Sequence, residues 1–131
     1  MKSVVKIGIM PKQAYIQRTI AIAKGEYKPQ PNEPKIWFES MQSMAQVLSY
    51  ENQELLRLIQ NEQPESLTEL EMISHRKKSN LSRTLKLLER YGVIKLEETT
   101  NKRKKPVVIA TDFEVSFGLN VDQHAFQQTP A

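Results

Sequence analysis

Residues 76–105 concentrate cations that could bind a polyanion. This basic segment has eleven basic and three acidic residues, a net charge of +8, whereas the other residues have eight and twelve, a net charge of −4. Its cations are Arg76, Lys77, Lys78, Arg83, Lys86, Arg90, Lys95, Lys102, Arg103, Lys104 and Lys105. An acidic body with one strongly basic stretch predicts a polyanionic partner there. The alternative is an ordinary solvated helix face beside a charged loop.

The residues at 77–91 have the periodicity of an amphipathic helix. At about 100° per residue, Leu81, Leu85 and Leu88 form a narrow apolar stripe opposite a polar, cationic face. Serine, asparagine and arginine on such a face suit hydrogen bonds to base edges, and lysine and arginine suit phosphates. The expected base-reading residues are Ser79, Asn80, Ser82 and Arg83. The expected phosphate-binding residues are Arg76, Lys77, Lys78, Lys86, Arg90, Lys102, Arg103, Lys104 and Lys105.

Two further groups of cations favour a phosphate-rich partner. The first, at 75–78, crowds the N-terminus of the same helix, where positive charge opposes the helix dipole and an incoming anion would offset it. The second, at 102–105, occupies an expected polar loop at 99–106 between strands at 93–98 and 107–110. Each cation of this basic hairpin tip could neutralise one phosphate.

The N-terminal elements must position or accompany this surface. Alternating apolar residues predict a strand around Val5, and Pro11 and Gly25 bound a helix over 11–24. The next segment, 26–34, contains three prolines and is expected to be an extended linker. A short strand is expected at 35–38.

Serine caps predict the helices that precede the basic segment. Ser40 and Ser49 are placed to begin two consecutive helices, the second ending near residue 61. Ser66 and Glu69 have the spacing of a capping box, in which the glutamate would reach back to the serine amide, and the short helix ends near residue 73. Met41, Met44 and Met72 are expected in the core.

The expected fold is α+β with three parts. Residues 1–34 form a strand-helix unit and proline-bearing linker for dimerisation or partner binding, and residues 35–117 form a DNA-binding domain that ends with a strand at 113–117. Residues 118–131 are expected to be a flexible tail. The dimer surface is expected among residues 4–24, 36–40 and 113–117.

The segment at 81–94, Leu-Ser-Arg-Thr-Leu-Lys-Leu-Leu-Glu-Arg-Tyr-Gly-Val-Ile, resembles the recognition-helix-to-wing segment of MarR- and ArsR-like winged helix regulators. The likeness spans residues 40–111. The N-terminal strand and helix, the prolines and Trp-Phe-Glu-Ser are similar to a family of winged-helix transcriptional regulators, some of which are TumA-type antitoxins. The resemblance implies a winged helix-turn-helix fold, with helix 77–91 in the major groove and a basic wing at 99–106 on the DNA backbone.

These patterns leave three functional hypotheses. The first is a sequence-specific, homodimeric regulator that binds double-stranded DNA. The second is an antitoxin that binds a toxin protein and autoregulates its operon, and the third is a winged helix used on RNA or in protein assembly. The base-edge chemistry of the 77–91 face favours the first.

Other chemistries find little support in the sequence. The chain has no cysteine and two histidines, His75 and His124, and no His, Asp or Glu cluster has metal-ligand spacing. Glu97 and Glu98 are neighbours on an expected strand and point to opposite faces. We therefore expect no enzyme activity, metal or cofactor. No apolar run approaches membrane-spanning length, so a cytoplasmic protein without membrane contact is expected.

Overall fold

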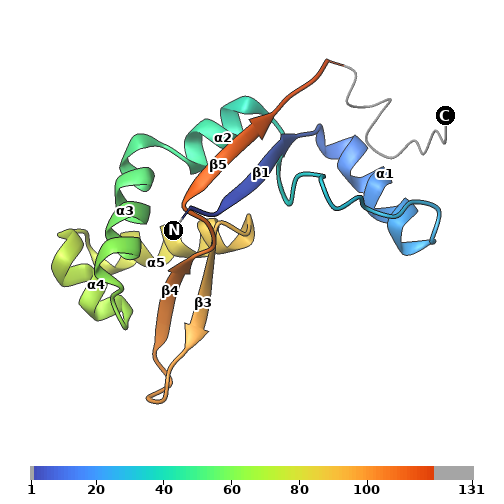
Figure 1. Cartoon of the computed structure of the whole chain (residues 1–131). Helices are drawn as coiled ribbons and strands as arrows, with labels where there is room; N and C mark the ends of the chain where they lie inside the picture. The colour runs from blue at the N-terminus through green and yellow to red at the C-terminus, as the bar shows by residue number, and fades with distance from the viewer. Residues whose placement is uncertain (1, 120–131) are drawn as a thin grey trace. The chain divides into compact units, whose positions relative to one another are not determined.

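The computed structural model describes residues 2–119, which form a mixed fold of the α+β kind with five helices and two small sheets (Figure 1). The contacts divide the chain into two compact units. Among the described residues, the first contains 3–44 and 112–119, and the second contains 45–111. The expected tail at 118–131 lies outside the described residues from position 120 on.

The first unit is built on a three-stranded parallel sheet. Its elements are β1 (Val4–Ile9), α1 (Lys12–Ala23), β2 (Ile36–Phe38), the start of α2 (Met41–Val47) and β5 (Asp112–Ser116). The strand order is β2-β1-β5, and Ile7 lies opposite both Ile36 and Val115. Parallel strands cannot be joined by a tight turn, so α1 and the proline-bearing linker carry the chain from β1 back to β2.

These pairings place the unit boundaries elsewhere than the sequence prediction did. The strands at 36–38 and 112–116 both pair with β1, so they belong to the first unit and not to a domain at 35–117. In the first unit, the predicted strands and the predicted helix at 11–24 are present within one or two residues of their expected bounds. Periodicity locates a strand but does not name its partner, which explains the difference.

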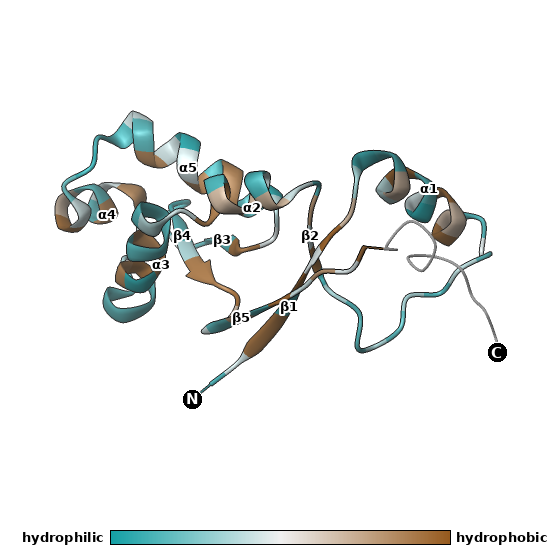
Figure 2. Cartoon of the chain, turned by 90° about the horizontal axis from the view of Figure 1, so that it is seen from above, coloured by the Kyte–Doolittle hydropathy of each residue, from teal (hydrophilic) through white to brown (hydrophobic). Residues whose placement is uncertain are grey.

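The central strand β1, largely apolar in Figure 2, requires glycine at one position. A Cβ atom at Gly8 would lie 2.4 Å from Trp37 Cζ3 and 2.9 Å from Pro34 Cγ. Trp37 is opposite Gly8 in the neighbouring strand, so its indole ring lies across the position where a side chain would begin. The missing side chain therefore lets Trp37 and the proline-bearing linker pack on the sheet.

Gly8→Ala is expected to destabilise the first unit by about 1–3 kcal/mol, because the rigid Trp37 and Pro34 rings must shift to admit a methyl group. Urea unfolding followed by Trp37 fluorescence measures the change, since Trp37 is the chain's one tryptophan. Gly118→Ala is the matched control, because no atom lies within 4 Å of a Cβ built there. Equal midpoints for the two variants would contradict this account of Gly8.

An ion pair fixes the linker of the first unit to α1. Arg18 Nη2 donates a hydrogen bond to Glu33 Oε1 at 2.8 Å, and Tyr27 Oη donates to the other carboxylate oxygen. The guanidinium carbon lies 5.6 Å from the Tyr27 ring centroid and 5.2 Å from that of Trp37. Arg18 is buried, and these contacts compensate its charge in two ways, by a carboxylate and by aromatic faces.

The second unit consists of three helices followed by a two-stranded hairpin. The elements are α3 (Tyr50–Glu62), α4 (Leu67–Ser74), α5 (Lys78–Arg90), β3 (Ile94–Glu98) and β4 (Lys104–Val108). β3 and β4 are antiparallel, with Ile94 opposite Val108 and Glu98 opposite Lys104. The core contains Leu55, Leu56, Ile59, Leu70, Leu81, Leu85, Leu88, Val93 and Ile94.

The predicted serine caps are confirmed. The hydroxyl oxygens of Ser40, Ser49 and Ser66 each accept a hydrogen bond from a backbone N–H three residues later, at 3.0, 3.2 and 3.2 Å. The predicted second half of the capping box is wrong. Glu69 Oε2 accepts a hydrogen bond from the backbone N–H of Glu65 at 3.3 Å and not from that of Ser66.

Candidate nucleic-acid interface

The α5 helix presents one buried and one exposed face, as its periodicity predicts. Leu81, Leu85 and Leu88 are buried, and the structural bounds differ by one residue at each end from the expected 77–91. On the other side Ser79, Asn80 and Arg83 are exposed, together with Lys86 and Arg90. These five residues are called the α5 outer face below. Ser82, also predicted to read bases, is half-buried and lines a groove beside this face.

The turn before α5 is held by contacts of its own residues. His75 is exposed and ends α4 with φ of 61°, in the left-handed region that favours glycine. Arg76 donates its backbone N–H to Ser74 Oγ at 3.2 Å and its Nη2 to the Glu51 carbonyl oxygen at 2.9 Å. Arg76 is thus half-buried and bonded to α3, which leaves its guanidinium less free for a phosphate than the sequence suggested.

The N-terminus of α5 already has an anion beside it. The backbone N–H of Lys78 donates to Glu71 Oε2 at 3.3 Å, and Lys78 Nζ lies 3.3 Å from Thr68 Oγ1. Lys77, the residue before the helix, provides no side-chain cap. The carboxylate of Glu71 therefore offsets part of the cost of crowding cations at this end. From the sequence alone, an incoming phosphate is expected to offset this cost.

The loop between β3 and β4 is shorter than the predicted loop at 99–106. The turn occupies residues 99–103 and is closed by the Thr99 N–H, which donates to the Arg103 carbonyl at 2.8 Å. Lys104 and Lys105 are strand residues of β4, opposite Glu98 and Glu97, and Lys105 Nζ lies 3.1 Å from Glu65 Oε2. Only Lys102 and Arg103 of the four predicted tip cations are therefore in the turn.

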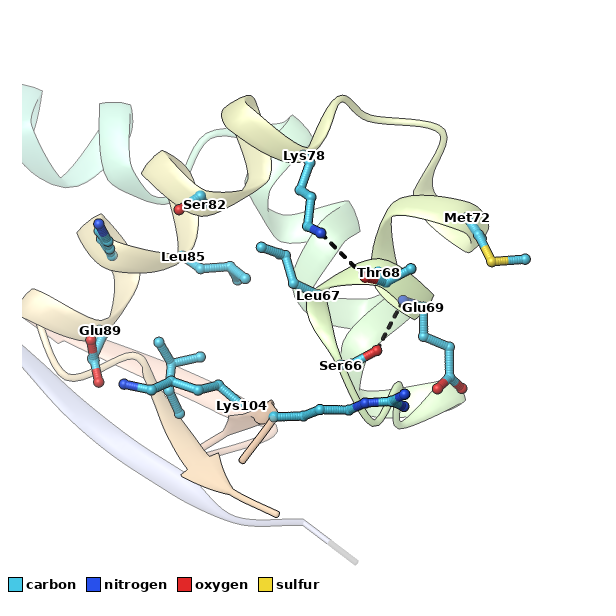
Figure 3. Close-up of a pocket in the computed structure, with 13 residues that line it drawn as sticks. Ser66, Leu67, Thr68, Glu69, Met72, Lys78, Ser82, Leu85, Glu89 and Lys104 are labelled. Carbon is cyan, nitrogen blue, oxygen red and sulfur yellow. Dashed lines mark hydrogen bonds between the residues drawn. The ribbon is translucent and has the colours of Figure 1, made fainter. Parts of the chain in front are cut away.

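A groove of about 610 Å³ lies between α4, α5 and the hairpin (Figure 3). Leu67, Leu85 and Leu96 give it an apolar lining, and Met72, predicted to be in the core, is 71% exposed at its edge. In Figure 3, Lys104 extends toward Glu89 of α5. The remaining charged residues of the lining are Glu69, Lys78, Lys86 and Arg103. Cations from α5 and from the hairpin thus border one depression.

A protein-family model matches residues 47–115, more than half of the chain. The chain belongs to the HVO_A0114 family. The part of the HVO_A0114 protein that the family model covers begins at Val47, includes all of α3 to β4, and ends in β5. Neither the curated proteins nor the solved structures contain a match to the chain.

Several cations of this HVO_A0114 protein have no partner in the described part of the chain. The side chains without a hydrogen bond or ion pair to residues 2–119 include those of Lys77, Arg83, Lys86, Arg90, Lys102 and Arg103. By contrast, Arg76, Lys78 and Lys105 each have one. These six cations lie on α5, at its start or in the hairpin turn, where they can bind anionic oxygens without breaking an internal contact.

The side chains exposed on this surface are polar and cationic. Within residues 2–119 no group of three or more His, Asp or Glu side chains could hold a metal ion. Nor does any helix in that range have the length and apolar character needed to cross a membrane. The surface offers hydroxyl, amide and guanidinium groups on the α5 outer face, and ammonium and guanidinium groups in the turn.

Proposed function

We propose that this HVO_A0114 protein is a sequence-specific DNA-binding transcriptional regulator of the winged helix-turn-helix type. One observation carries the proposal: α5 buries its leucine stripe while its outer face holds unpartnered cations, and a hairpin with two more follows at once. If α5 were only a solvated surface helix, it would not require cations both on its outer face and in the adjacent hairpin turn. A duplex has phosphates spaced to meet both.

In the proposed complex, α5 lies in the major groove with Ser79, Asn80 and Arg83 toward base edges. Lys77, Lys86 and Arg90 contact flanking phosphates, and the β3–β4 hairpin acts as a wing that places Lys102 and Arg103 on the backbone. Arg76, Lys78 and Lys105 contribute less, because each must first leave an internal partner. Ser82 and Lys104 line the protein groove between α4, α5 and the hairpin, so they contact the DNA only if a DNA strand enters that groove. The proposal involves no catalytic step and no cofactor.

A homodimer follows from the same proposal. One recognition helix contacts a single half-site, so sequence-specific proteins of this type commonly bind palindromic operators as two-fold dimers. Two copies of α5 would then read half-sites about one helical turn apart.

Protein binding is a second candidate function, favoured by the exposed apolar residues Tyr15, Ile16 and Ile20 on α1. In the antitoxin form of the proposal, this face of the first unit holds a toxin while the second unit represses the operon. The test is co-purification with the product of the adjacent gene. Retained binding by a Tyr15→Ser, Ile16→Ser, Ile20→Ser variant would exclude this face.

Neutralising the turn tests the wing. The double variant Lys102→Gln, Arg103→Gln is expected to weaken binding to every duplex alike. It should also make the negative salt slope, d log K/d log[salt], shallower by about 2, near 0.9 per lost phosphate contact. Fluorescence anisotropy over a salt series measures both quantities.

The matched control removes the same charge from the first unit through Lys24→Gln, Lys28→Gln, two exposed lysines outside the basic segment. A general effect of net charge would lower the affinity equally in both double variants. That result would contradict a wing at residues 99–103.

A further inference from the structure

Within residues 2–119, the parallel sheet of the first unit has two open edges, and they differ. On the β2 side the edge strand has only three residues and follows Pro34 and Lys35, features that discourage pairing with another strand. On the β5 side the strand has five residues, with neither proline nor a bulge in its register with β1. No other strand among residues 2–119 pairs with the outer side of β5.

The backbone N–H and C=O groups of β5 point alternately toward β1 and away from it. Asp112 N–H donates to the Ser3 carbonyl, so Asp112 directs its backbone groups toward β1. Backbone groups in a strand alternate in direction, and therefore those of Phe113 and Val115 point away from β1. Phe117 follows the strand directly and would continue this alternation if β5 were extended by one residue. Val115 and Phe117 also have 46% and 52% of their surface exposed. The open edge thus offers hydrogen-bonding groups and apolar side chains at the same residues.

We propose that β5 pairs antiparallel with β5 of a second copy, with the two-fold axis at Val115. In that register Val115 lies opposite Val115 of the second copy, and Phe113 lies opposite Phe117. Each of these pairs exchanges two backbone hydrogen bonds, and their side chains extend one apolar face. The result is a six-stranded sheet, within the usual size range, in place of two three-stranded ones.

The acidic residues of β5 exclude two neighbouring registers. Two-fold pairing keeps each face of the sheet continuous, so the axis must pass through a residue. An axis at Glu114 places two carboxylates opposite each other, and an axis at Phe113 places Asp112 opposite Glu114, both unfavourable. With the axis at Val115, Glu114 lies opposite Ser116 and Asp112 lies opposite Gly118, so no like charges meet.

A second copy is the occupant that this edge fits best. About Val115, the β5 segment places apolar residues opposite apolar residues and no like charges opposite each other, a match that an unrelated strand would not share. The inference concerns the first unit alone and holds whether or not the second unit binds DNA.

Single cysteines in the cysteine-free chain test the register. Val115→Cys places two thiols opposite each other at a Cα separation of about 5.5 Å, which suits a disulfide. Under mild oxidation, Val115→Cys is expected to form covalent dimers at least about tenfold faster than Glu114→Cys or Ser116→Cys alone. A mixture of Glu114→Cys and Ser116→Cys proteins is expected to cross-link, because these positions face each other. Non-reducing electrophoresis measures the rates.

Val115→Pro tests the edge without a new thiol. It removes an N–H that points away from β1, so the sheet within one copy is retained while the pairing between copies is lost. Light scattering is expected to give the mass of a dimer for the unaltered chain and of a monomer for this variant. Trp37 fluorescence reports whether the first unit remains folded.

Three outcomes would overturn the proposal: a monomeric unaltered chain, self-cross-linking of Glu114→Cys as fast as that of Val115→Cys, or a dimer in which Val115→Cys does not cross-link. Duplex binding is measured on the same samples. A dimer that binds no DNA removes the proposed function and leaves the pairing, whereas a monomer that binds DNA does the reverse.

Discussion

Arg83→Ala is expected to weaken binding to the preferred duplex by about 1–3 kcal/mol, about 5- to 150-fold, and to relax sequence preference at one position of each half-site. Arg83 is exposed in the middle of the α5 outer face, and its guanidinium forms no hydrogen bond or ion pair with another described residue. The loss therefore reflects the contact with DNA and not a disturbance of the fold. Titration of a fluorescent duplex and its single-base variants measures both effects.

Arg57→Ala is the matched control for Arg83→Ala. Arg57 belongs to α3 of the same unit, and its guanidinium carbon lies 5.8 Å from the centroid of the exposed Tyr50 ring. Its removal deletes the same charge away from α5 and is expected to leave sequence preference unchanged. An equal loss in both variants, on all duplexes, would mean that Arg83 acts only through its charge and reads no base.

Arg18→Ala is expected to destabilise the first unit by about 3 kcal/mol, because it leaves the partly buried Glu33 carboxylate without its cation. The substitution also removes the group that lies against the Tyr27 and Trp37 rings. Arg18→Lys should recover only part of the loss, since an ammonium group cannot repeat the planar contacts of a guanidinium. Urea unfolding followed by Trp37 fluorescence measures the change, and a loss below about 1 kcal/mol, typical of surface pairs, would contradict this account.

The same cluster predicts how the stability of the first unit depends on pH. Burial acts to raise the pKa of Glu33, but hydrogen bonds from Tyr27, Gln30 and Arg18 outweigh it and hold the pKa below its ordinary value. A lowered pKa contributes stability that is present above the pKa of the unfolded chain, about 4.3, and is lost as the pH falls through the folded value. Glu33→Gln is expected to remove this acid-side loss.

The raised pKa of Tyr27 affects the stability of the first unit at alkaline pH. Burial, followed by the hydrogen bond to Glu33 and the charge of that carboxylate, raises the pKa of Tyr27 to about 12, despite the opposing effect of Arg18. A raised pKa contributes stability that is fully present below the unfolded value, about 10, and is lost as the pH rises toward 12. Tyr27→Phe should abolish this alkaline loss, and an unchanged loss would show that another group causes it.

Local signals in the sequence predict most of the elements in the second unit and the face of α5. The leucines at 81, 85 and 88 repeat at helical spacing, and the serines at 40, 49 and 66 cap the helices that they precede. Both signals act within a few residues, so no tertiary information is needed to interpret them. The exposed Ser79, Asn80 and Arg83 follow directly from the leucine stripe.

Long-range pairing explains what the sequence does not predict. The pairing of β5 with β1 joins segments more than 100 residues apart, and no periodicity encodes it. The hairpin bounds depend on cross-strand partners, and the pairing of Lys104 and Lys105 with Glu98 and Glu97 draws two predicted loop residues into β4. The opposite charges of Glu97-Glu98 and Lys104-Lys105 are the sequence signal that could have indicated this pairing.

The role of Glu71 was also beyond the sequence prediction. Its carboxylate reaches the first N–H of α5 only because the turn at His75 folds α4 back toward α5. Once that contact is known, the cations at 76–78 are a weaker argument for phosphate, and the α5 outer face carries more of the case. The proposed DNA contact therefore depends chiefly on Arg83 and on the cations of the hairpin turn.

The most direct test of the proposed function is equilibrium binding of the full chain to a duplex from its own upstream region, with a scrambled duplex of equal length as competitor. The proposal predicts binding of the upstream duplex at least about 10³-fold tighter than of the scrambled one at physiological salt, and a steep fall in both affinities as salt rises. Equal affinity for the two duplexes, or binding to neither at low salt, would contradict it.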